Sequence, residues 1–121
     1  EEALITVKKV VSGMTVHESG IERLLASYGL FSATERLLME LGKRGANRQD
    51  MHEVIREESL KAWAIVQQGG ENPLLGYLLD NDEIKKYLTS DEVRELMDAS
   101  HYTGDAEARC DLVLRRVQDL L

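Results

Sequence analysis

The fold class is decided by NRQDMHEVIREESLKAWAIVQQGG, residues 47–70. Apolar side chains recur there every three or four residues, which is the spacing of one face of an α-helix. Asn47 is a residue type favoured at a helix N-cap, and Gly69 and Gly70 interrupt the pattern. We therefore expect a helix from Asn47 to Gln68, the longest of the chain. Its predicted buried stripe comprises Met51, Val54, Ile55, Ala62, Ile65 and Val66.

Two features of this helix concern its neighbours. Leu60 and Trp63 lie beside the main stripe, so we expect packing partners on two sides. Glu58 falls inside the stripe, where an unpaired carboxylate would be costly, and we expect it to pair with a basic residue of an adjoining helix or subunit. Glu57 and Lys61 have the spacing of an exposed i, i+4 ion pair.

Three helices are expected before this stretch. The first should end near Gly13. The second should stop at Gly29, where glycine can adopt the left-handed conformation. Ser32-Ala33-Thr34-Glu35 has the form of a capping box, so the third should begin at Ser32 and stop at Gly45. Their apolar positions are Ala3, Leu4, Val7, Val10, Val11 and Met14, then Ile21, Leu24, Leu25 and Tyr28, then Thr34, Leu37, Leu38 and Leu41.

After residue 70, short helices are expected. Asn72-Pro73 resembles an N-cap followed by proline at the first helical position, and Thr89-Ser90-Asp91-Glu92 forms a second capping box. Asp105 should cap the last helix. The predicted apolar positions are Leu74, Leu75, Leu78, Leu79, Ile84, Tyr87, Leu88, Val93, Leu96 and Met97, and in the last helix Ala106, Cys110, Val113, Leu114, Val117 and Leu121. The sequence thus predicts an all-α fold of about six to seven helices, preceded by the end of a longer helix.

Composition limits the class of protein. With 121 residues and 43% apolar content, the chain can bury one core. A net charge of −7 with scattered basic residues argues against nucleic acid or an anionic membrane as a partner. No apolar run approaches the ~20 residues of a membrane span, and no basic leader precedes an apolar segment. A single cysteine favours a reducing compartment, so we expect a cytoplasmic protein.

Candidate chemistry is sparse. The histidines His17, His52 and His101 share no metal-ligand spacing, and Cys110 is distant from each of them in sequence. We expect Cys110 to pack in the core as a small hydrophobic residue, and His101 to help dock its loop. We accordingly assign no catalytic, substrate-binding or metal-ligating residue and no cofactor.

Several segments, taken in order, resemble the C-terminal portion of the adenylosuccinate lyase family. They comprise residues 10–16 (VVSGMTV), 29–39 (GLFSATERLLM), 45–56 (GANRQDMHEVIR), 60–63 (LKAW), 87–92 (YLTSDE), 96–98 (LMD) and 101–104 (HYTG). Single pieces of this kind are common, because capped amphipathic helices are common. Their ordered combination covers essentially the whole chain and is what carries the resemblance.

The resemblance implies a function. The family belongs to the fumarase and aspartase superfamily, whose members are mostly homotetramers built around a bundle of long helices, with active sites shared between subunits. Its enzymes release fumarate from adenylosuccinate, giving AMP, and from a succinyl-carboxamide ribotide of purine biosynthesis. The superfamily's mobile serine loop, of the form Gly-Ser-Ser-x-Met-Pro-x-Lys-x-Asn-Pro, has no counterpart here, since Pro73 is the sole proline. We therefore expect a scaffold domain that is inactive alone.

The same resemblance predicts the organisation of the chain. Residues 1–14 would be the end of a central-bundle helix, consistent with a chain that opens at Glu1 without methionine, and residues 15–121 would be the C-terminal helical domain. The exposed stripe of Ala3, Val7 and Val10 should self-associate or pack back onto the domain. Two alternatives stay open: the corresponding domain of a superfamily relative such as a carboxymuconate cycloisomerase, and a free-standing helical interaction module.

Overall fold

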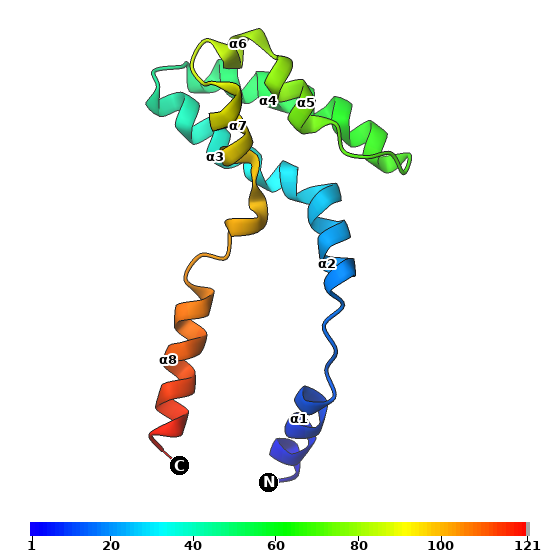
Figure 1. Cartoon of the computed structure of the whole chain (residues 1–121), viewed down its shortest axis with the longest axis vertical. Coiled ribbons are helices and arrows are strands. Elements are labelled where there is room, and N and C mark those ends of the chain that lie inside the picture. Colours follow the sequence, from blue (N-terminus) through cyan, green and yellow to red (C-terminus); the bar gives the residue numbers. More distant parts are fainter. Residues whose placement is uncertain (121) are drawn as a thin grey trace.

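Every regular element is a helix over residues 1–120, which are the residues that the computed structural model describes, the side chain of His101 excepted (Figure 1). The α-helices are α1 (Glu2–Ser12), α2 (Glu18–Leu24), α3 (Leu30–Lys43), α4 (Arg48–Gln67), α5 (Leu74–Asp80), α6 (Asp82–Lys85), α7 (Ser90–Met97) and α8 (Ala106–Gln118). A π-helical turn, η1 (Leu25–Gly29), joins α2 to α3, and a 3₁₀ turn, η2 (Ala99–His101), follows α7. The predicted all-α fold is confirmed.

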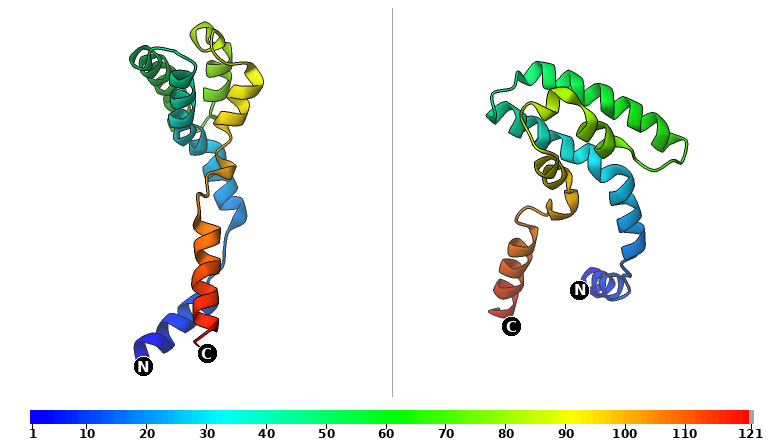
Figure 2. Two further views of the ribbon diagram at one scale, coloured as in Figure 1. Left: turned by 90° about the vertical axis from the view of Figure 1, so that its left-hand side faces the viewer. Right: turned by 45° about the horizontal axis from the view of Figure 1, so that its top comes forward.

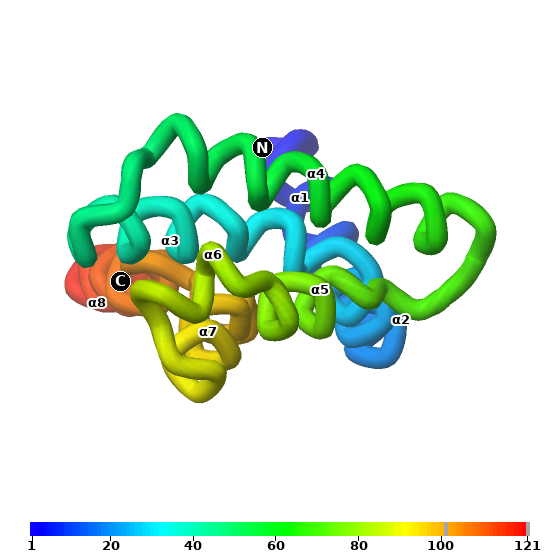
Figure 3. Tube along the Cα trace, turned by 90° about the horizontal axis from the view of Figure 1, so that it is seen from above, coloured from blue at the N-terminus to red at the C-terminus, as the bar shows by residue number. Residues whose placement is uncertain are grey.

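The chain has a packed head and two projecting legs. Helices α3 to α7 form the head, in which α3 lies between α4 and α7, and α5 contacts both α4 and α7 (Figure 3). One leg is α2 followed by α1, and the other is η2 followed by α8. Both legs leave the head on the same side, so α1 and α8 both lie at the end remote from it (Figures 1 and 2).

The head owes its stability to the apolar stripes of its helices. Leu37 and Leu41 of α3 are fully buried, as are Leu74 and Leu78 of α5. Burial of such side chains contributes about 1.5–3 kcal/mol each. The core as a whole consists of Ala33, Leu37, Leu38, Leu41, Ala46, Met51, Ile55, Ala62, Leu74, Leu78, Ile84, Leu88, Val93 and Met97. Of the positions predicted for the third helix, Thr34 is only half-buried, and Ala33 takes its place in the core.

Most of the predicted helix ends are confirmed by their local hydrogen bonds. Asn47 Oδ1 accepts from the backbone N–H of Gln49 at 2.9 Å, which caps α4. Thr89 and Glu92 form the expected capping box at the start of α7. Gly45, at φ +90°, ends α3 in the left-handed region that favours glycine.

The prediction for residues 29–35 is wrong. Gly29 has helical angles (φ −58°, ψ −37°), so the chain continues through η1 into α3 without a stop. Ser32 therefore lies inside the helix, where its N–H is already within the helical ladder and needs no cap. Glycine serves here for close approach: a β-carbon at Gly29 would lie 3.4 Å from Cβ of Ala99.

The start of α5 is displaced by one residue from the prediction. Pro73 is the N-cap rather than the first helical residue, and Asn72 Oδ1 accepts from the N–H of Leu74 at 3.0 Å. The amide of Asn72 also donates to the carbonyl oxygen of Ser27 at 2.8 Å. Asn72 thus ties the root of α5 to η1.

The expected burial of the last helix is wrong. Helix α8 begins after Asp105 as predicted, but Asp105 binds Arg109 at 2.7 Å instead of capping the helix. No described residue of α8 is buried, and Cys110 is exposed. The apolar spacing marks a face correctly, but none of the described residues covers that face. Leu121, the last position of the predicted stripe, lies outside the described residues.

Candidate functional site

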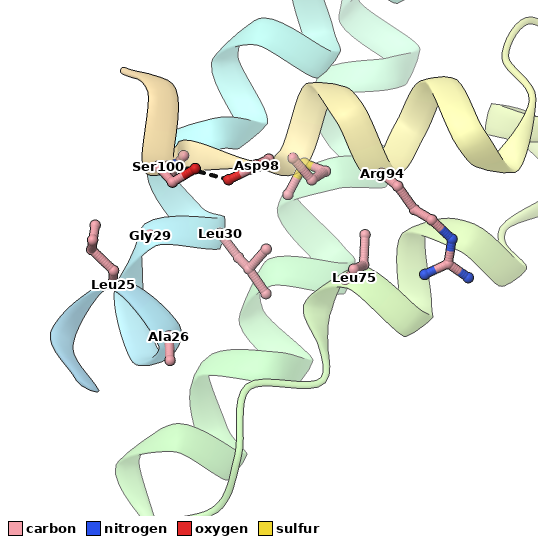
Figure 4. A pocket seen from close by; sticks show the side chains of 10 residues that line it. Leu25, Ala26, Gly29, Leu30, Leu75, Arg94, Asp98 and Ser100 are labelled. Carbon is pink, nitrogen blue, oxygen red and sulfur yellow. Dashed lines mark hydrogen bonds between the residues drawn. The ribbon is translucent and has the colours of Figure 1, made fainter. Parts of the chain in front are cut away.

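A cavity of about 370 Å³ lies where the two legs meet the head (Figure 4). One side is formed by η1 and the first residue of α3, and the other by α5, α7 and the η2 turn. Its lining residues are Leu25, Ala26, Gly29, Leu30, Leu75, Arg94, Met97, Asp98, Ala99 and Ser100. The walls are therefore mainly apolar, with polar groups at α7 and the turn after it.

The polar groups of this cavity have a structural explanation. Asp98 Oδ1 accepts from the backbone N–H of Ser100 at 3.0 Å and so caps η2. Arg94 is exposed at the side of the cavity formed by α7. The described lining contains no histidine, cysteine or lysine that could exchange a proton near neutral pH. The cavity is a space at a junction, and its described side chains do not form an acid–base pair.

A second cleft, of about 260 Å³, runs between α3 and α7 and holds a charged network. Arg44 Nη2 donates to Glu92 Oε1 at 2.7 Å, and Arg44 Nε donates to Glu40 Oε1 at 3.3 Å. Lys43 Nζ adds a bond of 3.1 Å to the other oxygen of Glu40. The network joins the C-terminal end of α3 to the first turn of α7, 48 residues away.

Glu92 is the carboxylate most perturbed by this network. The backbone N–H of Thr89, then the Arg44 guanidinium and then the Thr89 hydroxyl stabilise its charged form and lower its pKa from 4.5 to about 2. Hydrogen bonds from Lys43 and then Arg44 similarly hold the pKa of Glu40 below its ordinary value. The charges of Glu40, Lys43, Arg44 and Glu92 are bonded to one another, which suits a clamp between helices better than a catalytic pair.

This pKa shift makes stability depend on pH. Because the pKa of Glu92 is lower in the folded chain than in the unfolded chain, its stabilisation is present above pH 4.5 and is lost as pH falls toward about 2. We expect Glu92→Gln to weaken the acid-induced loss of stability between these limits, since glutamine keeps the cap acceptor but not the charge. Urea unfolding from pH 7 to pH 2.5 measures this. Glu57→Gln, at an exposed position of α4, is the control, and an unchanged pH dependence in Glu92→Gln would contradict the assignment.

The loop after α7 is attached to the head by an aromatic contact. The guanidinium of Arg36 lies 3.9 Å from the ring centroid of Tyr102, a cation–π geometry. The Tyr102 hydroxyl donates to the carbonyl oxygen of Leu96. These two contacts hold the root of the second leg against α3 and α7. The predicted docking role of His101 itself concerns a side chain outside the described residues.

The structure places the other candidate residues apart. His17 precedes α2 and His52 lies on α4, both exposed. Among the described side chains, no three of His, Cys, Asp and Glu come together as metal ligands. Nor does any helix within residues 1–120 have both the length and the apolar character of a membrane span.

The expectations for the glutamates of α4 are wrong in their partners. Lys61 binds Glu58 at 3.1 Å rather than Glu57, because the i, i+3 position is closer here. The other oxygen of Glu58 accepts from Asn81 Nδ2 at 3.3 Å. The half-buried Glu58, whose side chain is 15% exposed, is therefore satisfied by its own helix and an amide, without the basic residue from a neighbouring helix that we expected.

The legs carry the principal unpartnered surfaces of the described chain. In α1, α2 and α8 the apolar positions that periodicity marks as faces lie open to solvent, and α1 has not packed back onto the domain. The large exposed side chains are Leu4, Ile5, Val7, Val10 and Val11 in α1, Ile21 and Leu24 in α2, and Leu112, Val113, Leu114 and Val117 in α8. Such continuous apolar faces mark contacts with other protein surfaces.

Known proteins resemble this chain over nearly all of its length. Residues 31–113 match the family described as "Adenylosuccinate lyase C-terminus". An adenylosuccinate lyase of Methanocaldococcus jannaschii is 36% identical over 112 residues, covering 92% of this chain and 23% of the relative. One from Archaeoglobus fulgidus is 31% identical over 121 residues, covering 100% of this chain and 26% of the relative. An adenylosuccinate lyase of Helicobacter pylori is 31% identical over 110 residues, covering 87% of this chain and 25% of the relative.

The family model and the three relatives all point to adenylosuccinate lyase, and the family model describes its C-terminal part. The chain spans about a quarter of the length of the curated relatives it matches. They do not favour the carboxymuconate cycloisomerase alternative, since the matched relatives are named adenylosuccinate lyases. The chain belongs to the adenylosuccinate lyase family, as its C-terminal part.

Proposed function

We propose that this chain is the C-terminal domain of an adenylosuccinate lyase, a cytoplasmic enzyme of purine biosynthesis. The enzyme would eliminate fumarate from adenylosuccinate to give AMP, and from the succinyl-carboxamide ribotide to give the carboxamide ribotide. Within it, residues 1–14 would end a central-bundle helix and residues 15–121 would form the helical domain. The domain would complete the fold and border the active site without supplying the reacting groups.

The observation that carries this proposal is the contrast between the head and the legs. The head buries its own apolar stripes, whereas the stripes of α1 and α8 remain exposed. Apolar surface of this extent is typical of an interface with other protein. The subunits of a homotetramer would cover it, and in the isolated chain Ala3, Val7 and Val10 would promote self-association.

The chemistry of the reaction supports a scaffold role. A β-elimination needs a base beside the acidic carbon, an acid for the leaving amine, and positive or hydrogen-bonding groups around the carbanion. In the described part of the chain, Arg44 of the α3–α7 cleft is paired with Glu40 and Glu92, and the cavity at the leg junction is largely apolar. The reacting groups would therefore come from the remaining three quarters of the enzyme.

Two assays test the proposal. The purified 121-residue chain should release no fumarate from adenylosuccinate above the buffer rate, and an enzyme-like rate would refute the scaffold role. A chimaera in which this chain replaces the matching segment of the Archaeoglobus fulgidus relative should regain activity that the relative loses when that segment is deleted. If the deleted relative were fully active, the segment would be dispensable and the proposal wrong.

A further inference from the structure

The π-helical turn η1 stands at the only backbone connection between the head and the α1–α2 leg. Its last residue, Gly29, is buried against Ala99, the first residue of the other leg. Leu25 and Ala26 of the turn line the 370 Å³ cavity together with Leu75 of the head (Figure 4), and Met97 of the head lines it as well. The turn thus has a close contact on one side and free volume on another.

The turn changes the direction of the α2 face. Successive residues of an α-helix are about 100° apart, so an uninterrupted helix would place the α2 stripe roughly 170° from the core stripe of α3. A π turn bonds residue i to i+5 and holds one extra residue, which rotates everything before it by about 100°, the angle of one residue. The α2 face therefore points to the side of the head rather than directly away from it.

Contacts from the head stabilise this direction of α2. The Tyr28 ring lies 6.0 Å from the ring of Trp63 on α4, at an interplanar angle of 53°. Asn72, at the root of α5, donates to the carbonyl oxygen of Ser27 inside the turn at 2.8 Å. Both contacts join η1 to head elements that lie more than 30 residues further along the chain. Phe31 contacts Trp63 as well, at 5.4 Å, but from α3, so that contact does not depend on the direction of α2.

We propose that η1 is a rotary joint between the head and the α1–α2 leg. A change of this one turn between π and α hydrogen bonding turns the α2 face by about the angle of one residue. The Asn72–Ser27 hydrogen bond and the Tyr28–Trp63 contact stabilise the observed π-helical conformation of η1. The adjacent cavity leaves space for the turn to change conformation. Changes near the C-terminal end of α4, where Trp63 lies, or at the start of α5, beside Asn72, would in this way alter the direction of the leg.

Spin labels across the joint test this inference in the 121-residue chain. The labels are placed at Glu22→Cys on α2 and Glu57→Cys on α4, two exposed positions, in a Cys110→Ser background. Pulsed electron resonance then gives the distribution of distances between leg and head. We expect Asn72→Ala and Tyr28→Ala each to displace or split the main peak of the parent distribution.

The matched control is Asn81→Ala. Asn81 is also a half-buried asparagine that bridges head elements, through Glu58, and caps a short helix, but it does not touch η1. Its replacement should leave the distance distribution unchanged. The proposal would be overturned if both Asn72→Ala and Tyr28→Ala gave the same distance distribution as the parent chain. An equally large displacement of the peak in Asn81→Ala would also overturn it. Tyr28→Ala truncates a side chain that is half exposed, so it reports on the joint even if Asn72→Ala weakens the head.

Discussion

Replacing Leu37 with alanine should lower the free energy of unfolding of the chain by about 2–5 kcal/mol. Leu37 is 0% exposed at the centre of α3, the helix that contacts α4, α5 and α7. Truncation removes apolar burial and leaves a cavity that three neighbouring helices cannot all move to fill. Urea unfolding followed by circular dichroism at 222 nm measures the difference.

Leu114→Ala is the control for this prediction. Leu114 occupies an equally regular apolar position of α8 but is 56% exposed. Its truncation should change the unfolding free energy of the isolated chain by less than about 0.5 kcal/mol, as expected for a surface position. Equal losses in the two variants would show that α8 is packed in solution, contrary to the structure. In the proposed full-length enzyme, where other subunits would cover α8, the cost of Leu114→Ala should rise.

Replacing Ala62 with leucine should lower the free energy of unfolding by about 1–3 kcal/mol. Ala62 is 0% exposed on the face of α4 that meets the rest of the head. A larger side chain at this point forces neighbouring helices apart or into unfavourable rotamers. The same urea titration gives the size of the effect.

Ala64→Leu provides the comparison on the same helix. Ala64 is exposed two residues further along α4, and both substitutions exchange one strong helix former for another. Ala64→Leu should therefore leave stability nearly unchanged. A loss as large as that of Ala62→Leu would mean that helix propensity, and not close packing, limits this position.

The predictions that held rest on hydrogen bonds between residues close in sequence. Asn47 and the Thr89–Glu92 capping box involve partners two or three positions away, so the residue types alone indicate the helix starts. Gly45 is similar, because a left-handed residue at a helix end is a local requirement. Two of the predictions that failed, the stop at Gly29 and the burial of α8, depended on surfaces distant in sequence, whereas Lys61 and Asp105 took other partners only three or four residues away. Gly29 looked like a stop, but its contact is Ala99, 70 residues further along the chain.

The candidate sites show the same division. The sequence indicated Glu92 as part of a cap, but not that it binds Arg44, 48 residues away. The cavity at the leg junction could not be foreseen, because it is enclosed by residues 25–30, Leu75 and residues 94–100 together. Glu58 is the one polar residue for which the sequence indicated a need for partners, because it lies inside an apolar stripe.

The helical class, most of the helix ends and the family resemblance can be predicted from the residues alone, since each depends on spacing and cap chemistry over a few residues. Which apolar faces are buried follows instead from how the helices pack in three dimensions. Both α3 and α8 carry an apolar stripe with helical spacing, yet α3 is enclosed by the head and α8 is exposed. A helix's own residues determine where its apolar face lies, but burial requires a second surface, and that surface comes from elsewhere in the fold or from another protein.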